Sequence, residues 1–338
     1  MVMMKNRMIW AISLMSCLFG ATACQNDDIE YPDFEYQTVY FAKQTPIRTI
    51  TLGDDEYPRD LDNAHQCEIY AVVGGMNTNK RERKIEITVD NSLCEGLFFS
   101  DGRPVKAMPS EYYSLSSHTI TIPKDEIMAP VTVQLTDAFF ADPTTTEVTY
   151  VIPVRMVSAT DSILRDRDYT LYAINYKNKY HGCWLSRGVD EIQVTDSATK
   201  TVNRMPQYWE KADLVYLTTD ALQKSRYQVS TSLYSYETNG KLSVGLKACD
   251  LILHFDDNEH VTVTTDTPGC SVTGSGQWTR QGEKKAWGDK DRDQLKLEYE
   301  VTYNYESNGK PVTKSIKTTE TLVMRDRQSK LETFTLQK

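Results

Sequence analysis

Apolar and polar residues alternate along most of this chain, in short runs that turn-forming residues separate. Strands in the first half are expected at residues 38–41, 67–72, 84–89, 118–122, 131–135, 148–154 and 169–176. Alternation of this kind places one face of a strand on a core and the other in water. No long run has apolar residues at helical spacing, and short helical turns are expected only after Lys124 or around residues 220–224. Several short strands of this kind predict an immunoglobulin-like antiparallel sandwich over residues 36–176.

The second half continues as a series of hairpins. Its strands are expected at residues 183–195, 200–205, 212–218, 227–233, 242–246, 251–255, 260–265, 271–280, 294–305 and 313–325. Asn239-Gly240 and Asn308-Gly309 predict tight turns, because Asn and Gly both tolerate positive φ. The polar segment 175–180 marks the boundary between the halves. Consecutive hairpins close into an antiparallel barrel or fold into a second sandwich, so an all-β chain with a second β-domain over residues 177–338 is predicted.

One short motif favours the barrel. Gly182-Cys183-Trp184 opens the first strand of the second half, and Arg325 ends its last strand. This resembles the Gly-x-Trp opening and the late arginine of lipocalin-like barrels, where the Trp closes one end and the Arg stacks across it. A guanidinium stacks well on an indole ring. The resemblance implies a lipocalin-like barrel, and a second sandwich remains the alternative.

The first residues have the order of a secretory signal peptide. Two basic residues precede the apolar run Met8 to Phe19, which is shorter than the roughly 20 residues of a transmembrane helix. Small residues follow, up to Ala23, and Cys24 comes next. This order predicts a signal peptide over residues 1–23.

Cys24 is the expected lipid attachment site. A Cys directly after the small residues accepts diacylglycerol in bacterial lipoproteins, although Ala21 stands where the usual motif has Leu. The alternative is that the signal peptide is cleaved in the ordinary way and that Cys24 carries no lipid. The acidic start of the tether, residues 24–35, resembles the export signal of Bacteroidetes surface lipoproteins. The acyl chains would hold the protein firmly at the outer membrane. We expect it to face the cell exterior, with a periplasm-facing anchor as the alternative.

The charge of the chain excludes one class of partner. The formal charge of −9 becomes about −11 once the two basic residues of the signal peptide are removed. An acidic surface repels phosphate backbones, and no basic patch interleaved with aromatic residues occurs, so no nucleic-acid partner is expected. Acidic polysaccharides are disfavoured on the same ground, whereas neutral glycans, peptides and proteins remain open.

Cysteine spacing gives no metal or redox motif. Cysteines after Cys24 stand at positions 67, 94, 183, 249 and 270. An exported chain meets conditions that permit disulfides, but the sequence has no Cys-x-x-Cys pair. We expect mostly buried free thiols, with Cys249 and Cys270 as the pair close enough in sequence to test.

Four segments of the first half carry a family resemblance: residues 112–115, 119–124, 131–135 and 150–155. Over about residues 30–176, this half resembles the N-terminal sandwich domain of Bacteroidetes surface lipoproteins, whose genes commonly lie beside those for SusC/SusD-like glycan importers. In the second half, Gly274 to Trp278, Trp287-Gly288 and Arg292-Asp293 resemble the C-terminal domains that accompany it. The resemblance implies a glycan-associated outer-membrane lipoprotein that works with such an importer, and it transfers no set of binding residues.

Catalytic and metal motifs are missing from the sequence. It has no His-Glu-x-x-His, no Gly-x-Ser-x-Gly and no phosphate-binding glycine loop. His254 and His260 flank a predicted turn but are more often simply solvated. The carboxylates of Asp289 to Asp293 would suit Ca²⁺, but Lys290 and Arg292 compete for them. We therefore expect no catalytic residues, no metal and no cofactor.

Aromatic residues in loops are the candidate ligand contacts. Tyr208 and Trp209 follow Pro206 in one expected loop, and Trp287 lies in another. A sugar ring packs its C–H groups on such an aromatic face. The alternative is that each Trp folds onto the core, its commonest fate, as we expect for Trp184 and Trp278.

These observations favour a non-catalytic, glycan-binding accessory of a polysaccharide-uptake system, with Trp209, Trp287 and Tyr208 as candidate binding residues. The first alternative is a structural or adhesive spacer, or a protein-partner module, without a sugar site. An enzyme is the second alternative, and two facing carboxylates in a cleft would favour it.

Overall fold

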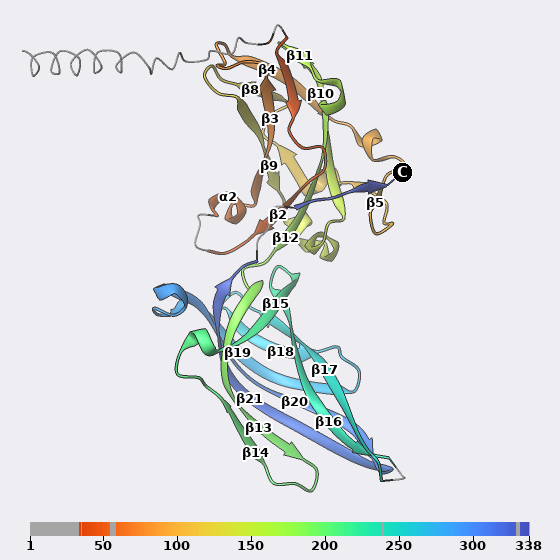
Figure 1. Cartoon of the computed structure of the whole chain (residues 1–338), viewed down its shortest axis with the longest axis vertical. Coiled ribbons are helices and arrows are strands. Elements are labelled where there is room, and N and C mark those ends of the chain that lie inside the picture. The colour runs from red at the N-terminus through yellow and green to blue at the C-terminus, as the bar shows by residue number, and fades with distance from the viewer. Residues whose placement is uncertain (1–33, 35, 55–58, 238–239, 329–331, 338) are drawn as a thin grey trace, which may run out of the picture.

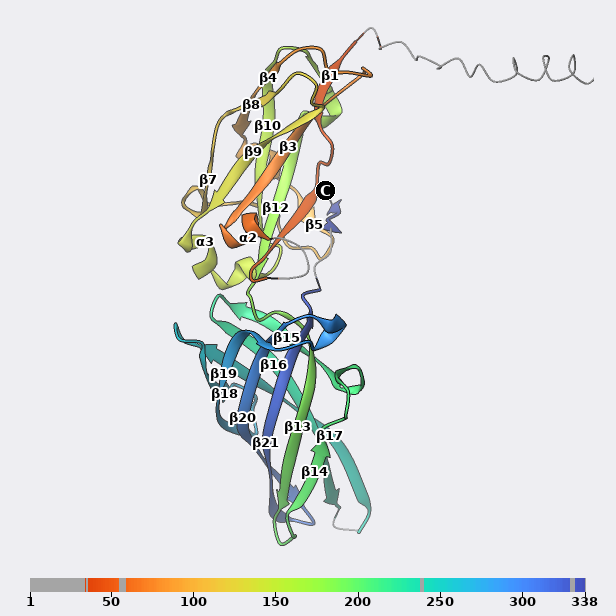
Figure 2. The same cartoon turned by 90° about the vertical axis from the view of Figure 1, so that its left-hand side faces the viewer.

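The protein consists of two β-domains stacked end to end (Figures 1 and 2). The structure is a computed structural model. It describes residues 34, 36–54, 59–237, 240–328 and 332–337. The predicted signal peptide, Cys24, the acidic tether and Asn239 of one predicted turn lie outside the described residues. In the part of the chain that the structure describes, no helix is long and apolar enough to cross a membrane. The prediction of an all-β fold with two domains is confirmed.

The first domain is a sandwich of two sheets. One sheet has the order β11 (Ser162–Ile163), β1 (Thr38–Phe41), β3 (Gln66–Gly74), β9 (Met128–Leu135), β7 (Tyr113–Leu115). The other has the order β22 (Glu332–Thr333), β2 (Pro46–Thr51), β12 (Tyr169–Lys177), β10 (Tyr150–Ala159), β4 (Arg83–Val89), β8 (Thr119–Ile122), with β6 (Lys106–Ala107) beside β10. A short pair joins β5 (Phe98–Phe99) to β23 (Leu336–Gln337).

The structure differs from the predicted sandwich in three details. The pairs β1–β11, β2–β12 and β6–β10 are parallel, so the sheets are not purely antiparallel. Strand β2, which begins at Pro46, is not among the predicted strands, because its burial does not alternate strictly. The helices are α2 (Asp60–Asn63), α3 (Asp137–Ala141) and the 3₁₀ turns η2 (Asn91–Cys94), η3 (Ser110–Tyr112), η4 (Pro143–Thr146) and η5 (Arg165–Arg167), not turns after Lys124 or at 220–224.

The alternation read from the sequence forms the sandwich core. In β3 and β9, every second residue is buried between the sheets, including Ile69 and Val133. Ile85 of β4 and Ile152 of β10 meet them from the other sheet. Each such side chain contributes about 1.5–3 kcal/mol when fully buried, so this core is the main source of stability of the domain.

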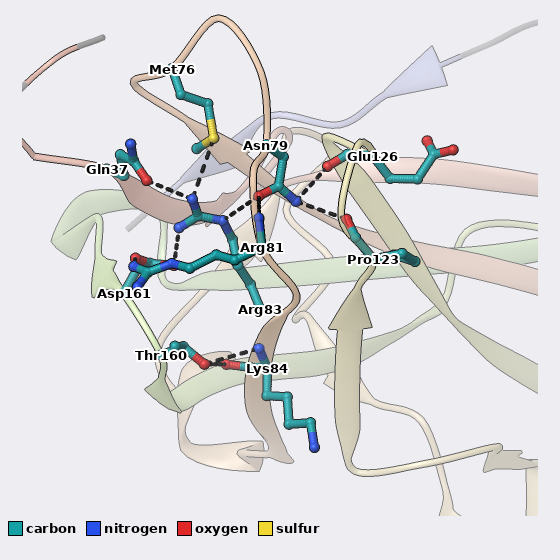
Figure 3. Close-up of polar contacts among 10 residues, drawn as sticks. All are labelled: Gln37, Met76, Asn79, Arg81, Arg83, Lys84, Pro123, Glu126, Thr160 and Asp161. Carbon is teal, nitrogen blue, oxygen red and sulfur yellow. Dashed lines mark hydrogen bonds and ion pairs between the residues drawn. The ribbon is translucent and has the colours of Figure 1, made fainter.

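A buried arginine holds together the loops at the end of the sandwich farthest from the second domain (Figure 3). Arg83 is 2% exposed and donates to Gln37 and, over 2.9 Å, to Asn79 Oδ1, and it forms an ion pair with Asp161. The Asn79 amide donates over 2.8 Å to the carbonyl oxygens of Pro123 and Glu126. Because these polar groups satisfy one another, we assign the cluster a structural role.

The second domain is a closed barrel, as the sequence favoured. Its sheet has the order β14 (Lys200–Arg204), β13 (Gly182–Val194), β15 (Asp213–Ala221), β16 (Lys224–Tyr236), β17 (Leu242–Phe255), β18 (His260–Thr265), β19 (Cys270–Glu283), β20 (Arg292–Ser307), β21 (Lys310–Asp326). The 3₁₀ turns η6 (Trp209–Lys211) and η7 (Trp287–Asp289) lie in its loops. Closure comes from β21, which pairs with β13 along twelve residues of each strand. The segments 242–246 and 251–255, predicted as two strands, form one strand.

The turn at Asn308-Gly309 is as predicted, with φ of 52° and 68° at its two residues.

The barrel end nearest the sandwich is closed differently from the sequence expectation. Trp184 is fully buried there, and its indole N–H donates to the carbonyl oxygen of Tyr180 over 3.0 Å. Arg325 does not stack on Trp184; its guanidinium lies over the ring of Trp287, 5.1 Å from the centroid. The expectation failed because Arg325 follows Met324, an inward residue, and the two-residue period turns its side chain outward. Gly182 is required here, since a Cβ would lie 2.4 Å from the carbonyl oxygen of Asp326.

The chain crosses between the domains twice, so the structure differs from the prediction that the second domain extends to residue 338. The barrel ends at Asp326, and residues 332–337 return to the sandwich as β22 and β23. Phe334 packs there against Phe99, with ring centroids 5.2 Å apart. The end of the chain therefore belongs to the first domain.

Candidate ligand-binding site

The barrel wall is split along one side. Strands β14 and β15 occupy successive stretches of the same edge of β13. Strand β15 pairs with β16 only as far as Tyr227, so residues 228–235 of β16 have no strand partner on that side among the described residues. A lateral mouth between β14 and β16 results, and the two strands diverge toward the lower end of the barrel in Figure 1.

Behind this mouth lies a cavity of about 450 Å³ inside the barrel. Asp190, Arg204 and Tyr227 line its polar end. Val229 and Ile316 belong to the aliphatic wall beyond it. A cavity of a few hundred Å³ with apolar walls and a few convergent polar groups is the usual form of a small-molecule site, so this is the candidate functional site.

A buried carboxylate forms the floor of the polar end. Glu320 of β21 is 2% exposed. It accepts hydrogen bonds from the Ser186 hydroxyl over 2.8 Å and from the Tyr299 hydroxyl over 3.0 Å. Longer contacts of 3.4 Å come from Tyr227 and Arg204. Burial raises the pKa of Glu320, and its hydrogen-bond donors and the Arg204 charge oppose that rise.

Arg204 is held in place by Asp190. Its Nε and Nη2 donate to the two carboxylate oxygens of Asp190 over 2.7 and 3.0 Å. Nη1 donates to the Ser186 hydroxyl over 3.2 Å, and the Thr318 hydroxyl donates to Asp190 over 2.9 Å. The hydrogen bond to Asp190 is the largest cause that raises the pKa of Arg204. Most of the N–H groups of Arg204 are therefore already committed to the protein.

Asp213 stands at the rim of the mouth. It lines the cavity and is exposed, and its carboxylate accepts no hydrogen bond from any residue within the described part of the chain. Together with Asp190 and Glu320 it makes three carboxyl groups against the single guanidinium of Arg204. This end of the cavity therefore favours neutral or positively charged groups over anions.

A lysine braces the opposite end of the mouth. Lys314 of β21 is 8% exposed, and its ammonium donates to the Thr231 hydroxyl over 2.8 Å and to the Ser232 carbonyl over 2.9 Å. The contact reaches across the barrel from β21 to the unpaired edge of β16. Burial lowers the pKa of Lys314, and the charge of Lys200 adds to that effect.

The sequence-predicted ligand residues lie outside the barrel, away from the cavity lining. Trp209 and Trp287 are half-buried and pack on one outer cluster with Leu185 and Val323. Arg187 covers the Trp209 ring at 3.7 Å, as Arg325 does for Trp287. Tyr208 is 55% exposed. The structure thus brings the two Trp residues onto one surface, and their role in binding stays a prediction. Trp184 and Trp278 are core residues, as expected.

The residues weighed as metal ligands have other partners. Asp291 pairs with Lys284 over 3.0 Å, and Asp293 pairs with Arg327. His254 contacts Thr264, and His260 contacts Asp256. Over the residues described, no three metal-binding side chains gather at one point.

The sequence of β21 contains a signal for the cavity that is not among the predicted site residues. Along β21, the inward positions read Lys314, Ile316, Thr318, Glu320 and Leu322. Polar residues at the core positions of a strand that is apolar farther on indicate a lined cavity rather than a packed core. The partner strands could not be known from this pattern, because the pairing is a tertiary feature.

The two domains match two family models. Residues 179–328, the barrel, match DUF5627, a domain of unknown function. Residues 34–163, within the sandwich, match a model described as an N-terminal domain. None of the curated proteins matches the chain.

One solved structure from Bacteroides resembles this chain along nearly its full length, and two others match it more weakly. A Bacteroides ovatus protein of unknown function is 34% identical, with a TM-score of 0.77 over 90% of this chain and 99% of that one. An auxiliary nutrient binding protein from Bacteroides thetaiotaomicron is 13% identical, with a TM-score of 0.39 over 82% and 89%. A Bacteroides ovatus protein proposed to bind carbohydrate is 11% identical, with a TM-score of 0.28 over 89% and 97%. By its identity with the first of these along nearly its full length, the chain belongs to this Bacteroides family of unknown function.

Proposed function

We propose that this protein is a non-catalytic binding protein that takes a small oligosaccharide, or the end of a longer one, through the lateral mouth into the barrel. The observation that carries the proposal is the split between β14 and β16 with the cavity of about 450 Å³ behind it. A barrel that served only as a packed body would gain stability by filling that space. An open, polar-ended cavity instead supports ligand capture.

The lining supports a sugar as the ligand. Tyr227 and Tyr299 line the cavity with hydroxyls that donate to Glu320 and can still accept a hydrogen bond, and Thr231 adds a hydroxyl near the mouth. The aliphatic wall around Val229 can take the C–H face of a sugar ring. Since the carboxyl groups outnumber the guanidinium at the polar end, neutral and amino sugars should bind there better than uronic acids.

Binding without reaction is part of the proposal. Asp190 is held by both Arg204 and Thr318, and Glu320 accepts hydrogen bonds from Ser186 and Tyr299. A glycosidase needs one carboxylic acid and one carboxylate poised at the scissile bond. Carboxyl groups that are engaged by protein donors on the cavity floor fit recognition better than proton transfer.

Location and partner complete the proposal. The predicted signal peptide and Cys24 support a lipid anchor in the outer membrane, with the protein facing the exterior. The sandwich would then act as a spacer that carries the barrel outward, since the two domains lie end to end (Figure 2). A SusC/SusD-like importer is the proposed acceptor of the captured sugar, on the strength of the family resemblance alone.

One observation favours a second function, a protein-partner module. Five apolar residues are exposed on the outer face of the β16–β17 hairpin, far from the sandwich: Tyr234, Tyr236, Leu242, Val244 and Leu246. Leu246 is 77% exposed. A contiguous apolar strip of this kind often marks a protein interface.

The test is a glycan-array screen followed by titration calorimetry on the chain from Gln25 onward. Val229→Phe narrows the mouth of the cavity, and the double variant Trp209→Ala/Trp287→Ala removes the outer platform. Loss of binding in Val229→Phe alone supports the cavity. Loss in the double variant alone moves the site to the outer surface, as the sequence predicted. Absence of binding to every glycan at millimolar concentration overturns sugar capture and favours the partner module.

A further inference from the structure

The second domain contains two thiols from different strands that meet at the barrel interior. Cys249 belongs to β17 and Cys270 opens β19. Strand β18 lies between these strands higher in the sheet, but its pairing with β17 ends at Leu251, opposite Thr265. Beyond that point β18 leaves the sheet, and β17 and β19 can approach each other directly.

A contact of Cys270 shows that β17 and β19 approach each other directly. Its Sγ lies 4.0 Å from the carbonyl oxygen of Ala248, the residue before Cys249 in β17. Cys249 Sγ lies 3.5 Å from the Thr265 hydroxyl at the end of β18, and Cys249 contributes to raising the pKa of Cys270, so the two side chains lie in the same part of the barrel wall. A disulfide requires Cβ atoms about 3.5–4.5 Å apart, and the contact of Cys270 with the residue before Cys249 brings the two segments close enough for us to consider such a bond.

We infer that Cys249 and Cys270 form a disulfide when the protein meets a thiol–disulfide oxidant such as oxidised glutathione. The two cysteines differ in access, since Cys249 is fully buried and Cys270 is half-buried. The Cys270 thiolate attacks one glutathione sulfur and releases the other glutathione as a thiol. The Cys249 thiolate then attacks the Cys270 sulfur and releases the second glutathione. Two protein thiols are oxidised to one disulfide, and one glutathione disulfide is reduced to two thiols.

The bond would connect the barrel beside one of its short strands. Strand β18 spans only the 6 residues His260–Thr265, whereas its neighbours β17 and β19 have 14 residues each. A covalent link between β17 and β19 replaces the missing hydrogen bonds below it. Tyr303, which lines the ligand cavity, has its pKa raised by burial and further by both thiols, so the pair lies against the cavity wall.

Burial raises the pKa of Cys270 to about 11, and the neighbouring Cys249 contributes. Because the thiolate is the attacking species, its fraction rises about tenfold per pH unit below that pKa. The reaction with oxidised glutathione should therefore be slow at pH 7 and about 100-fold faster at pH 9.

The test uses the reduced chain from Gln25, incubated with oxidised glutathione at pH 7, 8 and 9, then denatured, alkylated and mapped by mass spectrometry. The expected result is a 249–270 cross-linked peptide and three alkylated cysteines of five. Cys249→Ser should trap a glutathione adduct on Cys270. Cys94→Ser, a buried thiol elsewhere, should leave the cross-link unchanged. Five alkylated cysteines after prolonged treatment at pH 9, in protein whose circular dichroism is native, would overturn the inference.

Discussion

Arg327 and Asp293 form an ion pair of 2.8 Å at the junction of the two domains, and their side chains are 0% and 7% exposed. Arg327 also donates to the carbonyl oxygens of Asp54 in the first domain and Lys179 in the linker. Burial raises the pKa of Asp293, and the charge of Arg327 lowers it. One guanidinium thus joins the sandwich, the linker and the barrel.

Removing the carboxylate of Asp293 should destabilise the protein. Asp293→Ala removes the carboxylate that faces the buried guanidinium of Arg327, so we expect a loss of about 3–5 kcal/mol in the free energy of unfolding. Urea denaturation followed by Trp fluorescence measures it, because the Trp residues after position 180 all lie in the barrel. The matched control is Asp101→Ala, which breaks the exposed pair with Arg103 and should cause no measurable change. Equal effects of the two variants would contradict the structural role of the junction pair.

Glu320 should make stability fall as pH rises. Its pKa is raised in the folded state, chiefly by burial. The folded protein then binds the proton more tightly than the unfolded chain does, so stability is lost as pH rises from the usual carboxyl value near 4.5 through the raised one. Gln does not titrate. The difference in unfolding free energy between wild type and Glu320→Gln should therefore decrease over that window and become constant above it, as urea titrations at several pH values would measure. A difference that does not vary with pH would count against the assignment.

His181, in contrast, should make the stability of the protein fall as the pH falls. Burial lowers its pKa to about 3, with smaller contributions from Lys177 and Arg327. Between pH 6.5 and 3 the unfolded chain binds a proton that the folded protein does not, so stability falls with acidification. At pH 5 the loss from this group is about 2 kcal/mol. His181→Asn should remove that part of the acid sensitivity, which thermal unfolding at pH 7 and pH 5 can measure. If the stability of His181→Asn falls between pH 7 and pH 5 as much as that of the wild type, groups other than His181 cause the acid sensitivity.

The end of the chain should stabilise the first domain. Phe334 packs on Phe99 and covers a cluster that includes Leu171 and Val151. We expect Phe334→Ala to reduce the stability of the sandwich by about 1–2 kcal/mol, because the ring is only half-buried. Strand β22 pairs with β2, which in turn pairs with β12. Amide hydrogen exchange in β2 and β12 measures this loss of stability without relying on Trp fluorescence. Thr335→Ala, at an exposed position, is the control. Faster exchange confined to the barrel would contradict this role.

The alternation of side chains by itself determined that the protein is all-β and has two domains. It also identified most strands, because burying one face of a strand fixes a two-residue period. The turn at Asn308-Gly309 followed from the φ that its residues tolerate. Pro46 to Thr51 was missed because both faces of β2 are partly covered, so the period is lost.

Only the tertiary structure decided where the site is. The cavity exists because β15 pairs with β16 over a few residues and then separates from it, and no local pattern records that pairing. Glu320 and Arg204 are 116 residues apart and meet only through barrel closure. Trp209 and Trp287 resembled ligand platforms from their loops alone, yet each has a guanidinium over its ring. A residue's type fixes what chemistry it can perform, whereas strand pairing between distant segments fixes which residues perform it together.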